Sequence, residues 1–175
     1  MSVIVALEDA EVRMCLDIAV NRWMMKVSSK NKPNYEIGKK AGKLEHQLVN
    51  DLRSIVTEYA VAKHYALPHT LPFYLNSEHP RRVDHPDVGE NIEVRTLRTA
   101  VEVPVWQKDV NKNAVIVAGR VVDMDNPREV ELYGWIHSRF ATQPQWWFEE
   151  EQDWRVPVTA LESVDSLRVA PPIGV

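Results

Sequence analysis

Two carboxylates and a guanidinium lie close together in the chain, at Asp87, Glu93 and Arg95. The last two belong to the run Ile-Glu-Val-Arg-Thr, whose alternation of apolar and polar residues predicts a strand with Glu93 and Arg95 on one face and their apolar neighbours turned into a core. Gly89 and Asn91 tolerate positive φ, so they predict a turn that brings Asp87 back opposite Glu93. Facing side chains of an antiparallel pair have Cβ atoms about 5 Å apart. Two carboxylates at that spacing can share one hard cation, which predicts a metal and phosphate site.

The spacing Pro86-Asp87, five residues, then Glu93-x-Arg95 resembles the motif of the PD-(D/E)xK nuclease superfamily, with Arg95 where most members have lysine. A helix predicted upstream contains Glu58, so the acids occur in the order that the family uses. The run Gly134-Trp135-Ile136 is similar to a strand of small phage-encoded members. The resemblance covers roughly residues 42 to 136.

This resemblance implies a metal-dependent nuclease that hydrolyses phosphodiester bonds of nucleic acid, with DNA favoured as the substrate and endonuclease or exonuclease action left open. It implies that Glu58, Asp87 and Glu93 bind Mg²⁺ or Mn²⁺ and that Arg95 faces the scissile phosphate, so these four residues form the predicted catalytic set. Arginine stays protonated and cannot serve as a general base, although its fork binds phosphate oxygens well.

Two other functions remain open from the sequence. The change from lysine to Arg95 also suits a catalytically inactive protein of the same fold that binds nucleic acid or another protein. The acidic hairpin also suits a surface turn of a small structural or host-interaction protein, and Glu58 alone suits an ordinary surface residue at the border of a helix stripe. A homodimer is an open possibility for the assembly.

Length and composition predict one globular domain. The 175 residues are enough for one hydrophobic core and too few for two ordinary domains. We divide the chain into an N-terminal helix and basic loop (1–41), a core that carries the motif (42–136) and a C-terminal extension (137–175). No apolar run approaches the ~20 residues that span a bilayer, and no secretory leader is evident. The single cysteine, Cys15, fits a reducing interior, so we expect a cytoplasmic protein, in the host cytoplasm if it is phage-encoded.

Charge is distributed unevenly along the chain. Between Arg22 and Lys43 there are seven basic residues and one acid, a charge of +6, so the net charge of −4 leaves −10 for the rest. Such a block suits contacts to a phosphate backbone and equally suits a solvated surface. The residues that we predict to bind nucleic acid are Lys39, Lys40 and Lys43 in this block and Arg81 and Arg82 before the acidic hairpin.

Hydrophobic periodicity predicts helices over 7–28 and 43–66, the second with apolar residues spaced by three or four. Strands are predicted over 92–96, 101–106, 114–118 and 130–136, with 109–113 as the turn of a second hairpin and Pro104 placing its strand at an edge. A short helix is predicted to begin at a Ser138 cap. The fold class is therefore α/β with a mixed, largely antiparallel central sheet over 83–136, flanked by the N-terminal helices and a short C-terminal helix. The resemblance implies that it is restriction-endonuclease-like.

Histidine and tryptophan residues do not add a further predicted site. A zinc site is disfavoured because the chain has one cysteine and no regular Cys/His spacing. Trp23 and Trp135 lie within apolar patterns and are predicted to be core residues.

Overall fold

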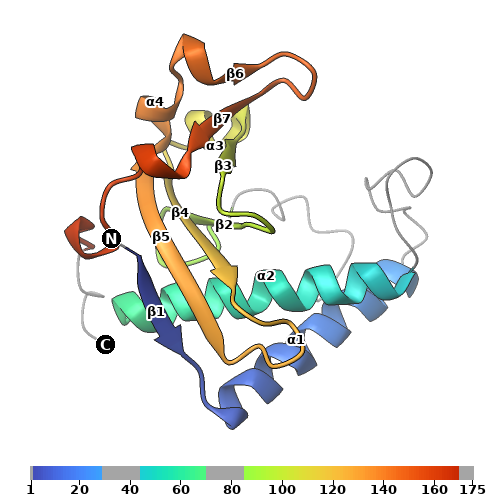
Figure 1. Cartoon of the computed structure of the whole chain (residues 1–175). Coiled ribbons are helices and arrows are strands. Elements are labelled where there is room, and N and C mark those ends of the chain that lie inside the picture. The colour runs from blue at the N-terminus through green and yellow to red at the C-terminus, as the bar shows by residue number, and fades with distance from the viewer. Residues whose placement is uncertain (1, 29–43, 70–84, 170–175) are drawn as a thin grey trace.

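The computed structural model describes residues 2–28, 44–69 and 85–169, which form a mixed α and β fold with two sheets (Figure 1). The larger sheet has the strand order β1-β5-β4-β2, and β1, β5 and β4 pair antiparallel while β2 pairs parallel with β4. Its strands are β1 (Val3–Ala6), β5 (Glu129–His137), β4 (Val115–Val121) and β2 (Ile92–Thr96). The sheet is therefore mixed and largely antiparallel, as predicted.

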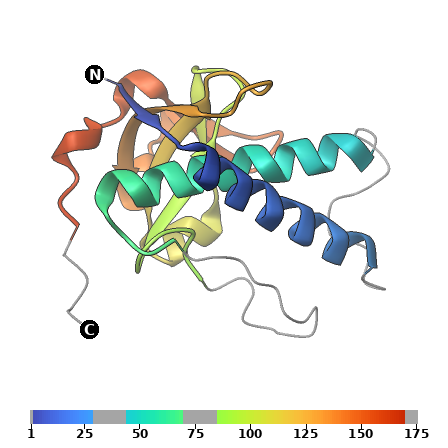
Figure 2. The same cartoon turned by 90° about the horizontal axis from the view of Figure 1, so that it is seen from below.

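The long helix α2 (Leu44–Tyr65) covers one face of this sheet, and the second long helix, α1 (Asp9–Ser28), packs against α2 (Figure 2). The apolar stripe of α2 predicted this contact. In the structure, Ile55 and Val56 are fully buried in the same core as Ile92. The helix packs closely at Gly119, where an added Cβ would lie 3.1 Å from the Thr57 side chain and 2.8 Å from that of Leu132. Both predicted helices are confirmed, although α1 begins two residues later than predicted.

A smaller antiparallel sheet packs on the opposite face of β4. It has the order β3-β7-β6 and consists of β3 (Glu102–Val105), β7 (Asp153–Pro157) and β6 (Trp147–Phe148). Ile116 and Ala118 of β4 belong to this second core with Val103 and Val156, while Val117 faces the helices. Both faces of β4 are therefore buried, which explains its continuous apolar run. Short helical elements complete this region: α3 (Gln107–Asn111), α4 (Ser138–Ala141), and 3₁₀ turns Pro144–Trp146, Val158–Ala160 and Val164–Ser166.

The predicted second hairpin is wrong. Strand β3 pairs with β7 and not with β4, and the supposed turn between them contains the helix α3. The Asp109 carboxylate accepts a hydrogen bond from the Trp106 backbone N–H at 2.8 Å, which favours a helix start where the sequence suggested a turn. Pro104 does lie on an edge strand, because β3 is at the end of its sheet.

Other predicted elements are confirmed with small shifts. The strands over 92–96 and 130–136 correspond to β2 and β5, and Ile116 is fully buried. Helix α4 forms where predicted, but its cap is His137, which accepts from the Arg139 N–H at 3.4 Å, so the Ser138 cap is wrong. Strand β1 was not predicted. Trp135 is partly buried against the main core and donates to the Ser166 hydroxyl at 3.0 Å. No helix within the described residues is long and apolar enough to cross a membrane.

Gly134 fixes the contact between β5 and the segment that follows β7. A Cβ at this position would lie 2.3 Å from the Glu162 carbonyl oxygen and 2.8 Å from Leu161 Cβ. We expect Gly134→Ala to lower the free energy of unfolding by about 1–3 kcal/mol, the usual cost of overpacking. Urea denaturation checks this, with the exposed Thr159→Ala as the control. Equal stability of Gly134→Ala and the parent protein would contradict the close packing.

Candidate functional site

The acidic turn forms as the sequence predicted. Val88 and Ile92 exchange both backbone hydrogen bonds, at 3.1 and 3.2 Å, and Gly89 has φ of 58°. These two residues form an isolated antiparallel bridge, and Asp87 and Glu93 are their neighbours in the chain. The turn therefore folds back along the outer edge of β2 and brings Asp87 to the strand that carries Glu93.

Asp87 is held by the backbone of that edge. Its Oδ2 atom accepts a hydrogen bond from the Val94 N–H at 2.8 Å. Burial and the negative charges of Glu58 and Glu93 raise the pKa of Asp87 to about 7, against the lowering effect of this hydrogen bond and of Arg95. Three predicted acids therefore share one electrostatic environment, although they come from α2, the turn and β2.

Glu58 reaches this environment from α2 and is more buried than predicted, with 6% of its surface exposed. Its two carboxylate oxygens lie 3.7 Å from Arg22 Nη1 and 3.5 Å from His69 Nε2. Arg22 belongs to the basic segment that we considered for nucleic-acid contacts, but in the structure it pairs with Glu58 from α1. His69 was not predicted to be part of the site, and its bridge to Val88 places it beside the acidic turn.

Glu93 lies between two basic side chains. The Nζ atom of Lys112 is 3.2 Å from Glu93 Oε1, and Arg95 Nη1 is 3.8 Å from Glu93 Oε2. Lys112 is the C-cap residue of α3. It was missed because we interpreted this segment as a turn. Correct recognition of Asp109 as a cap of a short helix would have placed Lys112 at a helix end facing β2.

Arg95 is engaged at every guanidinium nitrogen. Nε donates to the Pro104 carbonyl at 3.1 Å, Nη1 donates to the Val94 carbonyl at 3.2 Å, and Nη2 pairs with Asp109 at 2.5 Å. The guanidinium also stacks on Trp106, 4.1 Å from the ring centre. Arg95 is 6% exposed, whereas the side chain of Lys112 is 26% exposed, so Lys112 is the more accessible cation beside Glu93.

A divalent-metal site among these acids stays a prediction. Among the described residues no group of three or more His, Cys, Asp and Glu side chains is placed to hold one ion, so the convergence of all three acids on a metal stays a prediction. Mg²⁺ is commonly held by one or two carboxylates together with water and substrate phosphates. Asp87 and Glu93 supply that number of carboxylates on neighbouring positions of the turn and β2.

The residues predicted to bind nucleic acid lie outside the part of the chain that the structure describes. They are Lys39, Lys40, Lys43, Arg81 and Arg82. Their role stays a prediction.

Comparison with protein-family models, with curated proteins and with solved structures finds no match to this chain. The functional argument therefore rests on the geometry of the site.

The raised pKa of Asp87 predicts how stability depends on pH without metal. The folded-state pKa of about 7 lies above the ordinary value of 3.8, so the folded protein binds the proton more tightly than the unfolded chain does. This contribution to stability is present at low pH and is lost as pH rises from about 4 to 7. We expect Asp87→Asn to be more stable than the parent at pH 8, by a few kcal/mol at most, since one pKa unit corresponds to about 1.4 kcal/mol.

Urea unfolding in EDTA at pH 5 and pH 8 measures this effect. The parent should lose stability between the two values, and Asp87→Asn should lose less. The exposed Asp123→Asn controls for the general loss of a negative charge. If the stability of Asp87→Asn depends on pH as that of the parent does, the ionisation of Asp87 does not cause the loss of stability at high pH.

Proposed function

We propose that the chain is a metal-dependent nuclease that hydrolyses phosphodiester bonds, with DNA as the first substrate to test. The observation that carries this proposal is the burial of Asp87 in the field of Glu58 and Glu93, which raises the pKa of Asp87 to about 7. Clustered carboxylates are costly without a cation, and perturbed pKa values of this kind concentrate at functional sites. We extend the proposal to a restriction-endonuclease-like arrangement of α2, the turn and β2, because these elements supply the acids in the family's order.

In this proposal Asp87 and Glu93 hold Mg²⁺ or Mn²⁺. The ion, when bound, supplies positive charge that polarises the phosphoryl oxygen and increases the acidity of water. Asp87 is oriented by the Val94 N–H, and Glu93 is oriented by Lys112 and Arg95. The motif resemblance also assigns Glu58 to this ion, a role that would require it to leave Arg22 and His69.

We propose Lys112 as the basic residue that faces the substrate phosphate. The motif resemblance assigns this role to Arg95, but the three guanidinium nitrogens of Arg95 already bind Pro104, Val94 and Asp109. Lys112 is partly exposed and lies 3.2 Å from Glu93, and an ammonium group is a compact charge with three donors. It can therefore stabilise negative charge that develops on the phosphate.

One observation favours the alternative function, a catalytically inactive nuclease-fold protein that binds nucleic acid or protein. Glu58 and Glu93 each already have basic partners, which can neutralise the cluster without a metal ion. In that case the site is structural, and added Mg²⁺ should have no effect on stability.

Metal titration tests the proposed function directly. Mn²⁺ or Mg²⁺ should raise the melting temperature of the parent, since an ion at 100 times its Kd stabilises a protein by about 2.7 kcal/mol. Asp87→Asn and Glu93→Gln should remove both this rise and the cleavage of labelled duplex and single-stranded DNA. Glu129→Gln, an exposed substitution on β5, is the matched control and should retain both. A melting temperature that does not respond to either ion, together with no cleavage, would reject the nuclease.

Paired substitutions separate the roles of the two basic residues. Lys112→Met should lower kcat by about 10²-fold or more, the usual effect of losing one donor to a developing charge, and should keep the metal-induced rise in melting temperature. Arg95→Lys keeps the charge but cannot reproduce the three-sided contact, so it should cost about 1–3 kcal/mol of stability. Full cleavage by Lys112→Met would return the phosphate role to Arg95.

A further inference from the structure

Two arginines share one neutral acceptor on the surface beside α2 and β2. Arg53 Nη1 and Arg98 Nη2 each donate to Asn50 Oδ1 at 3.0 Å. Asn50 and Arg53 are on α2, and Arg98 lies just beyond the end of β2. A single amide oxygen thus holds two positive groups next to each other.

Neither guanidinium has a carboxylate partner within salt-bridge distance among the described residues. Other arginines of the structure do have one: Arg120 pairs with Glu131 at 3.3 Å, and Arg128 pairs with Asp9 at 2.6 Å. An amide oxygen accepts hydrogen bonds but supplies no negative charge to balance two cations. Within the part of the chain that the structure describes, the Arg53 and Arg98 pair is therefore incompletely compensated.

The proximity has an electrostatic cost. Burial first, and then the positive charge of Arg98, lowers the pKa of Arg53. Like charges held together favour the binding of an anion, and guanidinium forks match the oxygens of a phosphate in two-point contacts. Because Asn50 orients both side chains, the pair is organised before any ligand arrives.

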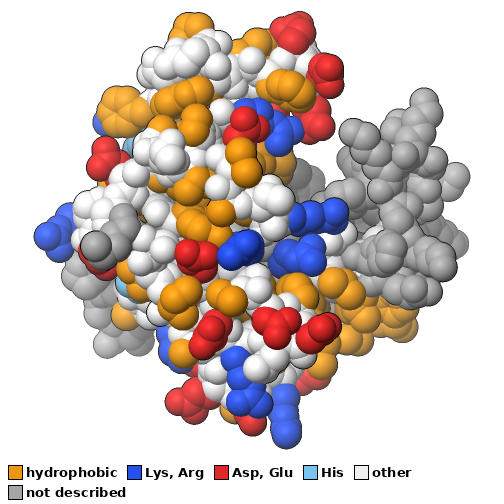
Figure 3. Space-filling view, viewed as in Figure 1, with side chains coloured by type: hydrophobic (Ala, Val, Ile, Leu, Met, Phe, Trp, Pro, Cys, Tyr) orange, Lys and Arg blue, Asp and Glu red, His pale blue; other side chains and the backbone are white. Residues whose placement is uncertain are grey.

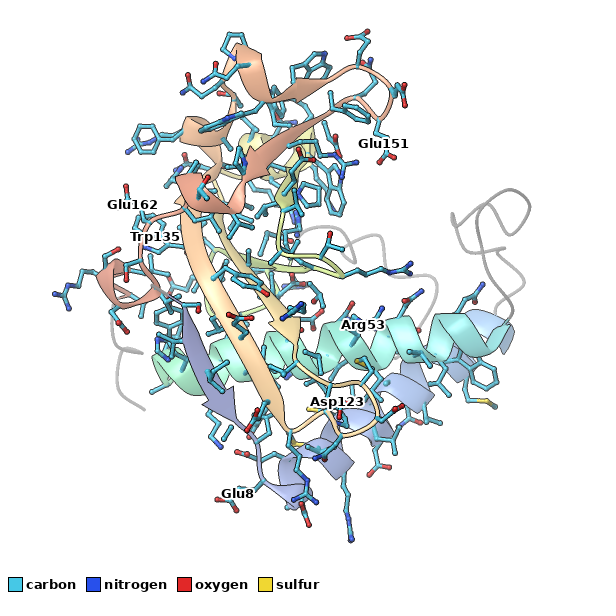
Figure 4. All side chains as sticks on the ribbon, in the orientation of Figure 1. Glu8, Arg53, Asp123, Trp135, Glu151 and Glu162 are labelled. Carbon is cyan, nitrogen blue, oxygen red and sulfur yellow. The ribbon has the colours of Figure 1, made fainter. Side chains whose placement is uncertain are left out.

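The position of the pair relates it to the acidic site. Figure 3 shows Lys and Arg side chains gathered at mid-height of one face, and Figure 4 labels Arg53 on α2 at that height. Arg98 is five residues beyond Glu93 along the chain that leaves β2, a span of at most about 16 Å at ~3.3 Å per residue. This limit corresponds to at most about five nucleotides of a duplex strand, at ~3.4 Å each.

We infer that Arg53 and Arg98, oriented by Asn50, form a binding site for a backbone phosphate of nucleic acid, within about five nucleotides of the bond near Asp87 and Glu93. The site of cleavage rests on the proposed nuclease function, whereas phosphate binding by the arginine pair does not. The pair contributes affinity and register without base specificity, because phosphate contacts are common to all sequences.

Fluorescence anisotropy in EDTA tests the inference without any cleavage. The probes are a labelled 20-bp DNA duplex and a 20-nucleotide single strand, each in two unrelated sequences. Arg53→Gln/Arg98→Gln should weaken binding of every probe by a similar factor, at least tenfold at low salt. The slope of log K against log[salt] for the duplex should fall by about 0.9, since the pair contacts one phosphate and each lost phosphate contact contributes about 0.9.

Two matched variants make the result specific. Arg128→Gln/Arg139→Gln removes the same charge from exposed positions elsewhere and should change affinity much less. Asn50→Asp keeps both arginines but places a carboxylate between them, so it should weaken binding while preserving or increasing the melting temperature. Equal losses in the Arg128 and Arg139 double variant, or undiminished binding by Asn50→Asp, would overturn the assignment.

The remaining outcomes distinguish this site from the proposed nuclease and from other phosphate ligands. Loss of cleavage in Asp87→Asn with full binding, and loss of binding in the arginine variant, would support both proposals. Binding that depends on the pair in a protein that never cleaves would support the phosphate site alone. No binding of either probe, or pair-dependent binding only to vesicles of phosphatidylserine and phosphatidylcholine, would overturn the nucleic-acid site.

Discussion

The packing around β2 depends on how the buried charges of Glu93 and Arg95 are paired. Glu93 and Arg95 are each 6% exposed on a strand whose other face contributes Ile92 and Val94 to the main core. Buried charges are costly unless they are paired and hydrogen-bonded. Lys112 and Asp109 provide those partners, and both lie in or directly after α3. The requirement to pair two charges therefore fixes the short helix and the small sheet against β2.

Of the two basic residues beside Glu93, Arg95 is buried and structural, whereas Lys112 is accessible. Arg95 links β2 to the Pro104 carbonyl of β3 and to Asp109 of α3, so its removal would loosen the contact between the two sheets. Lys112 is partly exposed, and among the described residues its ammonium group pairs with Glu93, so it can move toward a ligand at small cost. In the proposed function, Lys112 would supply the cation that faces the substrate, and Arg95 would remain structural.

The acidic turn and the arginine pair at Asn50 carry opposite charges. At the turn, Asp87 is partly buried, and its surroundings and the negative charges of Glu58 and Glu93 raise its pKa. Beside α2, Arg53 and Arg98 share a neutral oxygen and gain from an anion. A nucleic-acid strand with bound divalent ions supplies both kinds of charge, which is why we relate the two sites to one substrate.

Local patterns in the sequence determined the long helices, the period-two face of β2 and the turn at Gly89, because these depend on neighbours a few residues apart. The same information brought Asp87 back to β2, where its carboxylate accepts a hydrogen bond from the Val94 N–H. Only the tertiary structure decided that β3 pairs with β7, that Val3–Ala6 joins β5, and that Lys112 and His69 reach the acids. These contacts join segments that are distant in the chain, and their free energy comes from burial and charge pairing that no local pattern encodes.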